Sequence, residues 1–97
     1  MVCTHDLKGK LLTINHHGAE TVGRTVDEMT GRNLSEFIVP GQRKELAAYL
    51  QLIAESGEAQ GLLHMPHADG DVRVVAYRNK LIVTPGRTPY VLSLIHI

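Results

Sequence analysis

The chain begins with a pattern typical of two short β strands joined by a tight turn. Two β-prone stretches, residues 2–6 and 10–14, flank Leu7-Lys8-Gly9. Glycine adopts the backbone conformations that a tight turn requires at little steric cost. We therefore expect an antiparallel hairpin at the start of the fold.

Polar residues that cap helices occur three times over the next 25 positions. Asn15 precedes a helical segment that ends near position 22. The pairs Thr25…Glu28 and Asn33…Glu36 have the capping-box spacing, in which each side chain satisfies the backbone amide of the other residue. Glycines at positions 23, 31 and 41 interrupt the pattern, so we expect several short helices.

One longer helix is predicted over residues 42–56, and Gly57 is suitably placed just beyond its end. Its apolar residues recur at helical spacing and form one stripe. The residues of this stripe are Leu46, Ala47, Leu50, Ile53 and Ala54.

The last forty residues favour β structure, with strands expected over residues 59–65, 72–83 and 89–97. Asp69-Gly70 is a strong hairpin signal, and residues 84–87 form a second turn. The order is therefore two strands, several helices, then three strands. This order predicts an α+β fold in which helices cover one face of an antiparallel sheet.

Composition limits the possible functions. The chain has 97 residues, enough for one domain, with ten Lys and Arg against ten Asp and Glu. Balanced charge argues against nucleic-acid binding, which requires a basic face. The single cysteine cannot form an internal disulfide, and no apolar run is long enough to span a membrane. We expect a cytoplasmic domain without nucleic-acid or membrane partners. Its apolar last residues suggest that it was cut from a longer protein.

Taken in order, several short motifs resemble those of a PAS domain. They are residues 6–9 with Asn15, 22–34, Val39-Pro40, Leu50…Gly57, Asp69-Gly70, 77–82 and 86–91. The resemblance implies one PAS domain over residues 1–97, with a five-stranded antiparallel sheet in the order 2-1-5-4-3. It implies a sensory module without enzymatic activity, belonging to a larger regulator such as a sensor histidine kinase, a diguanylate cyclase or a transcription regulator.

In many PAS domains a small cavity between sheet and helices holds a ligand. Carrying over the family's inward positions gives Leu34, Leu46, Leu50, Leu63, Met65, Val75, Tyr77, Asn79, Ser93 and Ile95. Among these, Tyr77, Asn79 and Ser93 are expected to form hydrogen bonds with a ligand. The alternative is that the same residues simply fill the core.

Two cofactors of the family are not expected. Light-sensing flavin relatives carry a cysteine after the Gly-x-Asn motif, whereas Leu34 follows Gly31-Arg32-Asn33 here, so a covalent flavin adduct is excluded. Haem-binding relatives carry a histidine on the long helix, and residues 42–56 contain none. The resemblance leaves the ligand unknown, and a non-covalent flavin remains open, although the chain has no Trp to stack on it.

The remaining reactive residues do not predict a metal site or a catalytic site. His16 and His17 diverge by about 100° on a helix. Strand alternation points His64 and His96 away from the cavity, and neither has a Cys or carboxylate partner at the spacing that metal ligands require. Cys3 is expected at a frayed N-terminus with no base beside it, so a nucleophilic role is not indicated.

The outer face of the last strand is the candidate interface. Tyr90, Leu92, Leu94 and His96 should all point away from the helices, and an apolar row of this kind is rarely left in water. We expect a homodimer or packing against a flanking helix. Two functions remain open: a ligand-sensing module, or a dimerisation module without any ligand.

Overall fold

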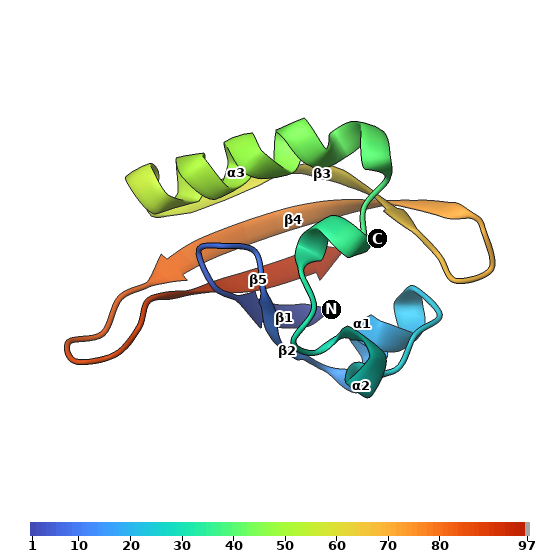
Figure 1. The fold of residues 1–97 in the computed structure, drawn as a ribbon, viewed down its shortest axis with the longest axis horizontal. Coiled ribbons are helices and arrows are strands. Elements are labelled where there is room, and N and C mark those ends of the chain that lie inside the picture. Colours follow the sequence, from blue (N-terminus) through green and yellow to red (C-terminus); the bar gives the residue numbers. More distant parts are fainter. Residues whose placement is uncertain (97) are drawn as a thin grey trace.

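The computed structural model describes residues 1–96, and its sheet has five antiparallel strands in the order β2-β1-β5-β4-β3 (Figure 1). The strands are β1 (Val2–His5), β2 (Leu11–Ile14), β3 (Glu58–Pro66), β4 (Val72–Ile82) and β5 (Tyr90–His96). The predicted fold class and strand order are confirmed. Because β5 pairs with both β1 and β4, the first and last strands lie side by side in the middle of the sheet. Position 97 of the predicted last strand lies outside the described residues.

Three short helices begin where the capping residues predicted, and a fourth, the 3-10 helix η2 (Pro40–Gln42), has no side-chain cap. The three predicted helices are α1 (His16–Thr21), α2 (Val26–Met29) and the 3-10 helix η1 (Leu34–Glu36). The side chain of Asn15 accepts a hydrogen bond from the Gly18 amide, 3.0 Å away. Both capping boxes form, the one at Thr25 and Glu28 with distances of 3.0 and 3.1 Å. Local polar contacts therefore fix these helix starts.

The long helix α3 (Arg43–Ser56) runs along β3 and β4 and buries a narrower stripe than its sequence predicted (Figure 1). Ile53 is fully buried, whereas Ala47 and Ala54 are exposed, so their placement in the stripe was wrong. Tyr49 is half-buried instead, because it lies three residues after Leu46 and four before Ile53 and so shares their face. This turn of the helix brings a phenol toward the sheet.

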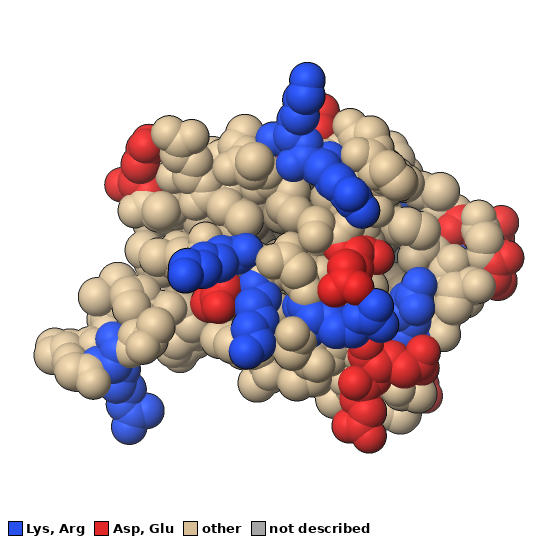
Figure 2. Space-filling model, in the orientation of Figure 1, with Lys and Arg blue, Asp and Glu red and all other residues tan. Residues whose placement is uncertain are grey.

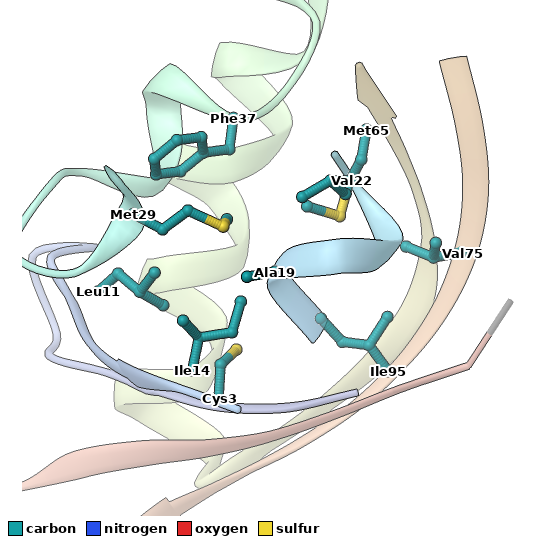
Figure 3. Packing of buried hydrophobic residues seen from close by; sticks show 10 residues of the cluster. All are labelled: Cys3, Leu11, Ile14, Ala19, Val22, Met29, Phe37, Met65, Val75 and Ile95. Atoms are coloured by element: carbon teal, nitrogen blue, oxygen red, sulfur yellow. The ribbon is translucent and has the colours of Figure 1, made fainter. Parts of the chain in front are cut away.

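The main hydrophobic core lies between the inner face of the sheet and the helices (Figure 3). Leu11 and Ile14 of β2 meet Ala19 of α1 and Met29 of α2 there. Cys3 also belongs to this core, with 4% of its surface exposed, because β1 is paired on both sides. The expectation that Cys3 lies at a frayed end was therefore wrong.

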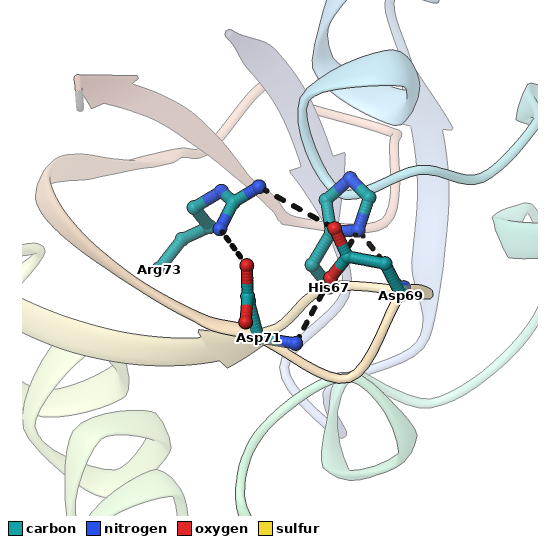
Figure 4. A network of polar contacts seen from close by, with 4 residues as sticks. All are labelled: His67, Asp69, Asp71 and Arg73. Carbon is teal, nitrogen blue, oxygen red and sulfur yellow. Dashed lines mark hydrogen bonds and ion pairs between the residues drawn. The ribbon is translucent and has the colours of Figure 1, made fainter.

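The hairpin between β3 and β4 is anchored to the end of α1. The Ala68 amide donates to the Val22 carbonyl at 2.9 Å, and the His67 ring lies against Gly23. Figure 4 shows the polar contacts that hold the turn: His67 and Arg73 lie beside Asp69, and Arg73 also contacts Asp71. The Asp71 amide donates to the Asp69 carboxylate, and this hydrogen bond, together with the neighbouring His67 and Arg73, holds the pKa of Asp69 below its usual value.

Charge does not single out a site on the face drawn in Figure 2, where acidic and basic side chains are interleaved. Part of this arrangement is local pairing, such as Arg32 with Glu36 at 2.6 Å. No helix within residues 1–96 combines the length and the apolar character needed to cross a bilayer. The most distinctive chemistry of the described chain lies in its interior.

Candidate functional site

A cavity of about 360 Å³ lies between the inner face of the sheet and the helices. All five strands contribute to its sheet side, and its helical side includes Leu34, Phe37, Leu46 and Tyr49. Gln42 and Glu45, at the start of α3, line its mouth together with the exposed Leu62. The volume falls at the lower end of small-molecule pockets, which span roughly 300–1,000 Å³.

Most of the predicted site residues line this cavity. They are Leu34, Leu46, Leu63, Met65, Tyr77, Asn79, Ser93 and Ile95. The Tyr77 ring reaches the cavity by lying across Gly61, where an added Cβ would come within 2.9 Å of the Tyr77 hydroxyl. The small residue on the neighbouring strand therefore sets the position of this aromatic wall.

Leu50 and Val75 are not among the cavity-lining residues in the described part of the chain, so these two assignments are corrected. Val75 is 1% exposed and belongs to the core cluster that contains Ala19 and Val22, so it packs within the core. Leu50 is turned toward the hairpin between β1 and β2, where its side chain approaches Gly9.

A chain of hydrogen bonds between buried side chains crosses one wall of the cavity. Nδ1 of His5 lies 2.7 Å from the Asp6 carbonyl oxygen, and Nε2 of the same ring lies 2.7 Å from the Tyr49 hydroxyl. That hydroxyl lies 2.6 Å from Nδ2 of Asn79. The Tyr49 ring also meets His5 and Tyr77 edge to face, at centroid distances of 5.6 and 5.5 Å. Tyr49 thus links β1, α3 and β4.

The direction of each hydrogen bond in this series follows from the first one, between His5 and the Asp6 carbonyl. A carbonyl oxygen can only accept, so Nδ1 of His5 carries the proton. Burial lowers the pKa of His5, so the ring is neutral and Nε2 is an acceptor. Burial also raises the pKa of Tyr49 to about 12, so this phenol keeps its proton and its O–H donates a hydrogen bond to Nε2 of His5. The Tyr49 oxygen then accepts from Asn79.

These directions fix the orientation of the Asn79 amide. Nδ2 must face Tyr49, which leaves Oδ1 on the other side of the group. Asn79 is 6% exposed, and its Oδ1 has no hydrogen-bond donor within residues 1–96. A buried polar atom without a partner is uncommon in folded proteins. Asn79 lines the cavity, and its Oδ1 is an acceptor that the described protein does not satisfy.

Sequence reasoning missed three polar residues of this wall, namely Cys3, His5 and Tyr49. Strand alternation from Cys3 places His5 on the same inner face, so this signal was available. Helical spacing from Leu46 to Ile53 likewise placed Tyr49 inward. Contact between the two side chains depends on how α3 crosses the sheet, which no local pattern specifies.

The reactive groups of the cavity are held in unreactive forms. Burial raises the pKa of the Cys3 thiol, against a smaller opposite effect of its hydrogen bond with Ser93, so the thiol stays protonated. Both ring nitrogens of His5 are engaged, so neither presents a lone pair to the cavity. Within residues 1–96, no three His, Cys, Asp or Glu side chains gather as a metal site requires.

We expect the free energy of unfolding to fall as the pH drops below about 6.5, the ordinary pKa of His5. Above that pH the ring is neutral in both states. Below it, the unfolded chain takes up a proton that folded His5, whose pKa is lowered, does not. Stability is then lost, by up to about 1.4 kcal/mol per pH unit, until the pH reaches the folded pKa.

Urea denaturation at pH 7.5, 6.5, 5.5 and 5.0 measures this dependence. His5→Gln should flatten the profile between pH 6.5 and 5.0, because the titrating ring is gone. His17→Gln, which replaces an exposed histidine of α1, is the matched control and should keep the wild-type slope. An unchanged slope in His5→Gln would show that another group carries the dependence.

The outer face of the sheet carries the four residues assigned to an interface. Tyr90, Leu94 and His96 are exposed and Leu92 is half-buried. Neighbouring strands extend the apolar surface: Val2 lies beside Leu94, and Leu62 is 68% exposed. A hollow on this face is lined by Leu62, Ala76, Leu94 and His96, among others. Several large apolar side chains are thus exposed on this face.

Comparison with known proteins agrees with the fold. A family model described as the PAS fold matches residues 1–97. No curated protein sequence matches the chain closely enough to show a relationship.

Several solved structures are similar. The PAS domain of an HTR-like protein from Haloarcula marismortui shares 17% identity at a TM-score of 0.85, covering 99% of this chain and 78% of that one. The PAS-B domain of Drosophila melanogaster Cycle, with bound ethylene glycol, shares 13% identity at a TM-score of 0.86, and the match covers 98% of this chain and 96% of that one. A domain of a sensory box sensor histidine kinase/response regulator from Geobacter sulfurreducens shares 18% at 0.77, covering 95% and 79%.

Proposed function

Because the chain belongs to the PAS family, we propose that it is the ligand-binding sensory module of a larger cytoplasmic signalling protein, such as a sensor histidine kinase. PAS domains are sensory signalling modules and are generally not enzymes. The observation that carries the proposal is the cavity of about 360 Å³, which is lined by Asn79, a residue whose buried Oδ1 has no partner in the described chain. A core that served packing alone would be expected to leave neither the space nor the acceptor.

The strand pairing supports a route by which binding could act beyond the cavity. Asn79 lies opposite Ser93 of β5, and Ser93 lies opposite Cys3 of β1. On β5, Ser93 and Ile95 face the cavity while Leu92 and Leu94 face the outer surface. A ligand that moved β5 would therefore shift the outer row as well. Such a ligand must bind one arrangement of the sheet better than the other.

A second candidate function is dimerisation through the outer face of the sheet, favoured by its apolar exposure. Leu94 is 39% exposed and Val74 50%, both on the face opposite the cavity, and Leu62 of the edge strand β3 is 68% exposed. A second copy of the chain presenting the same face would cover them. In this alternative the domain acts as an interaction module and the cavity stays without a ligand.

Native mass spectrometry of the freshly purified chain tests both candidates in one measurement. Sensing predicts a retained small molecule that is lost on denaturation. Dimerisation predicts a doubled mass that disappears in Leu94→Lys, which places a charge in the apolar row. A chain that is dimeric and carries no small molecule in any preparation would contradict the sensing proposal and favour the alternative.

A further inference from the structure

We infer that the ligand of this cavity is a small neutral molecule with an apolar body and one hydrogen-bond donor, which Asn79 Oδ1 accepts. The inference rests on the proposed sensing function, and it adds the chemical class of the ligand. Aromatic N–H groups, amide N–H groups and hydroxyls are the donors that fit this description.

The need for a donor comes from the hydrogen-bond chain behind Asn79. Nδ1–H of His5 donates to the Asp6 carbonyl, Nε2 of His5 accepts a hydrogen bond from the Tyr49 hydroxyl, and the Tyr49 oxygen accepts one from Nδ2–H of Asn79. Rotating the amide would place its oxygen against the Tyr49 oxygen, whose proton already points to His5. Asn79 lines the cavity and is more than nine-tenths buried, so we assign the unpartnered acceptor side of its amide to the ligand. Leaving such an acceptor unpaired is costly, so a donor there binds favourably.

The rest of the lining indicates a neutral, apolar body. Near the buried end it consists largely of aliphatic and sulfur-containing side chains, including Met29, Met65 and Ile95. Among the described lining residues there is no Lys or Arg, and the one carboxylate is that of exposed Glu45 at the mouth. An anion would therefore be desolvated without a side-chain counter-charge. A ligand that offered only acceptors would set its lone pairs against Asn79 Oδ1.

Three bicyclic probes of nearly identical shape separate these requirements. Indole has a ring N–H donor, indene has a CH₂ at the same position, and benzofuran has an oxygen acceptor. We expect indole to bind about tenfold more tightly than benzofuran, as one buried hydrogen bond gained or lost would give, with indene between them. Dissociation constants come from titrations of the ¹⁵N-labelled chain followed by NMR.

Asn79→Leu removes the acceptor while keeping the volume of the side chain. In this variant the ratio of the indole and benzofuran dissociation constants should collapse to within about twofold. Gln60→Leu is the matched control, because it replaces an exposed amide on the edge strand β3 and should keep the wild-type ratio. If Asn79→Leu does not fold, the Asn79 side-chain carbonyl ¹³C shift in the wild-type protein decides. Indole, and not indene, should move it.

The outcomes separate the inference from the function on which it rests. Equal binding of all three probes, or tighter binding of benzofuran, overturns the donor requirement while the cavity remains a ligand site. A preference for indole that survives in Asn79→Leu also overturns it, since another group would then accept. Failure of all three probes to bind overturns both the inference and the proposed sensing function.

Discussion

Replacing Gly23 by alanine should destabilise the domain by about 3 kcal/mol. Gly23 has φ of +74°, a conformation that costs other residues about 1–2 kcal/mol. A Cβ at this position would also lie 2.4 Å from Cε1 of the His67 ring, so the ring must move. Overlap of this kind adds about 1–3 kcal/mol. Displacement of His67 would also disturb its contact with Asp69 in the hairpin turn.

Gly31→Ala separates the two contributions. Gly31 has a similar φ of +87°, but an added Cβ would meet nothing within 4 Å. This control should cost only the backbone term, about 1–2 kcal/mol. The double variant Gly23→Ala with His67→Ala should recover part of the excess by removing the clashing ring. Urea denaturation measures all three, and equal losses in the two glycine variants would refute the role of His67.

The predictable part of this fold consists of local signals. The capping residues Asn15, Thr25 and Asn33 marked helix starts correctly, because a cap is satisfied by amides within three residues along the chain. Asp69-Gly70 marked its hairpin for the same reason, since a turn depends on the conformations of its own residues. The strand order was not local, and it came from the resemblance of the motifs in sequence order.

The site was predictable where strand alternation decides which way a side chain points. Tyr77, Asn79, Ser93 and Ile95 line the cavity as the alternation required. Alternation gives a face but not a position along the sheet, and therefore Val75 was assigned to the cavity although it packs within the core. The hydrogen-bond chain joins positions 5, 49 and 79, so it exists only once the helix and sheet have packed. These three residues are too far apart along the sequence for any local pattern to include two of them.

Tyr49→Phe is the substitution expected to disrupt the hydrogen bonds between His5, Tyr49 and Asn79 most, with a loss of about 2–3 kcal/mol in stability. The phenylalanine keeps the edge-to-face contacts with His5 and Tyr77. Loss of the hydroxyl leaves two buried groups without a partner, Nε2 of His5 and Nδ2 of Asn79. Each such group costs about 1–3 kcal/mol when it is left unsatisfied. Denaturation in urea at pH 7.5 measures the loss with neutral His5.

Tyr77→Phe is the control for the loss of a hydroxyl at the same cavity. Its hydroxyl has no hydrogen-bond partner among residues 1–96, so the expected loss is below about 0.5 kcal/mol. Equal losses for the two tyrosines would contradict a linking role for Tyr49.

The hydroxyl of Tyr49 also fixes the Asn79 amide, so its removal frees the amide to rotate. Tyr49→Phe should therefore weaken the preference for indole over benzofuran. Oδ1 of Asn79 is still present in this variant, and Tyr49 affects it only by fixing the orientation of the amide.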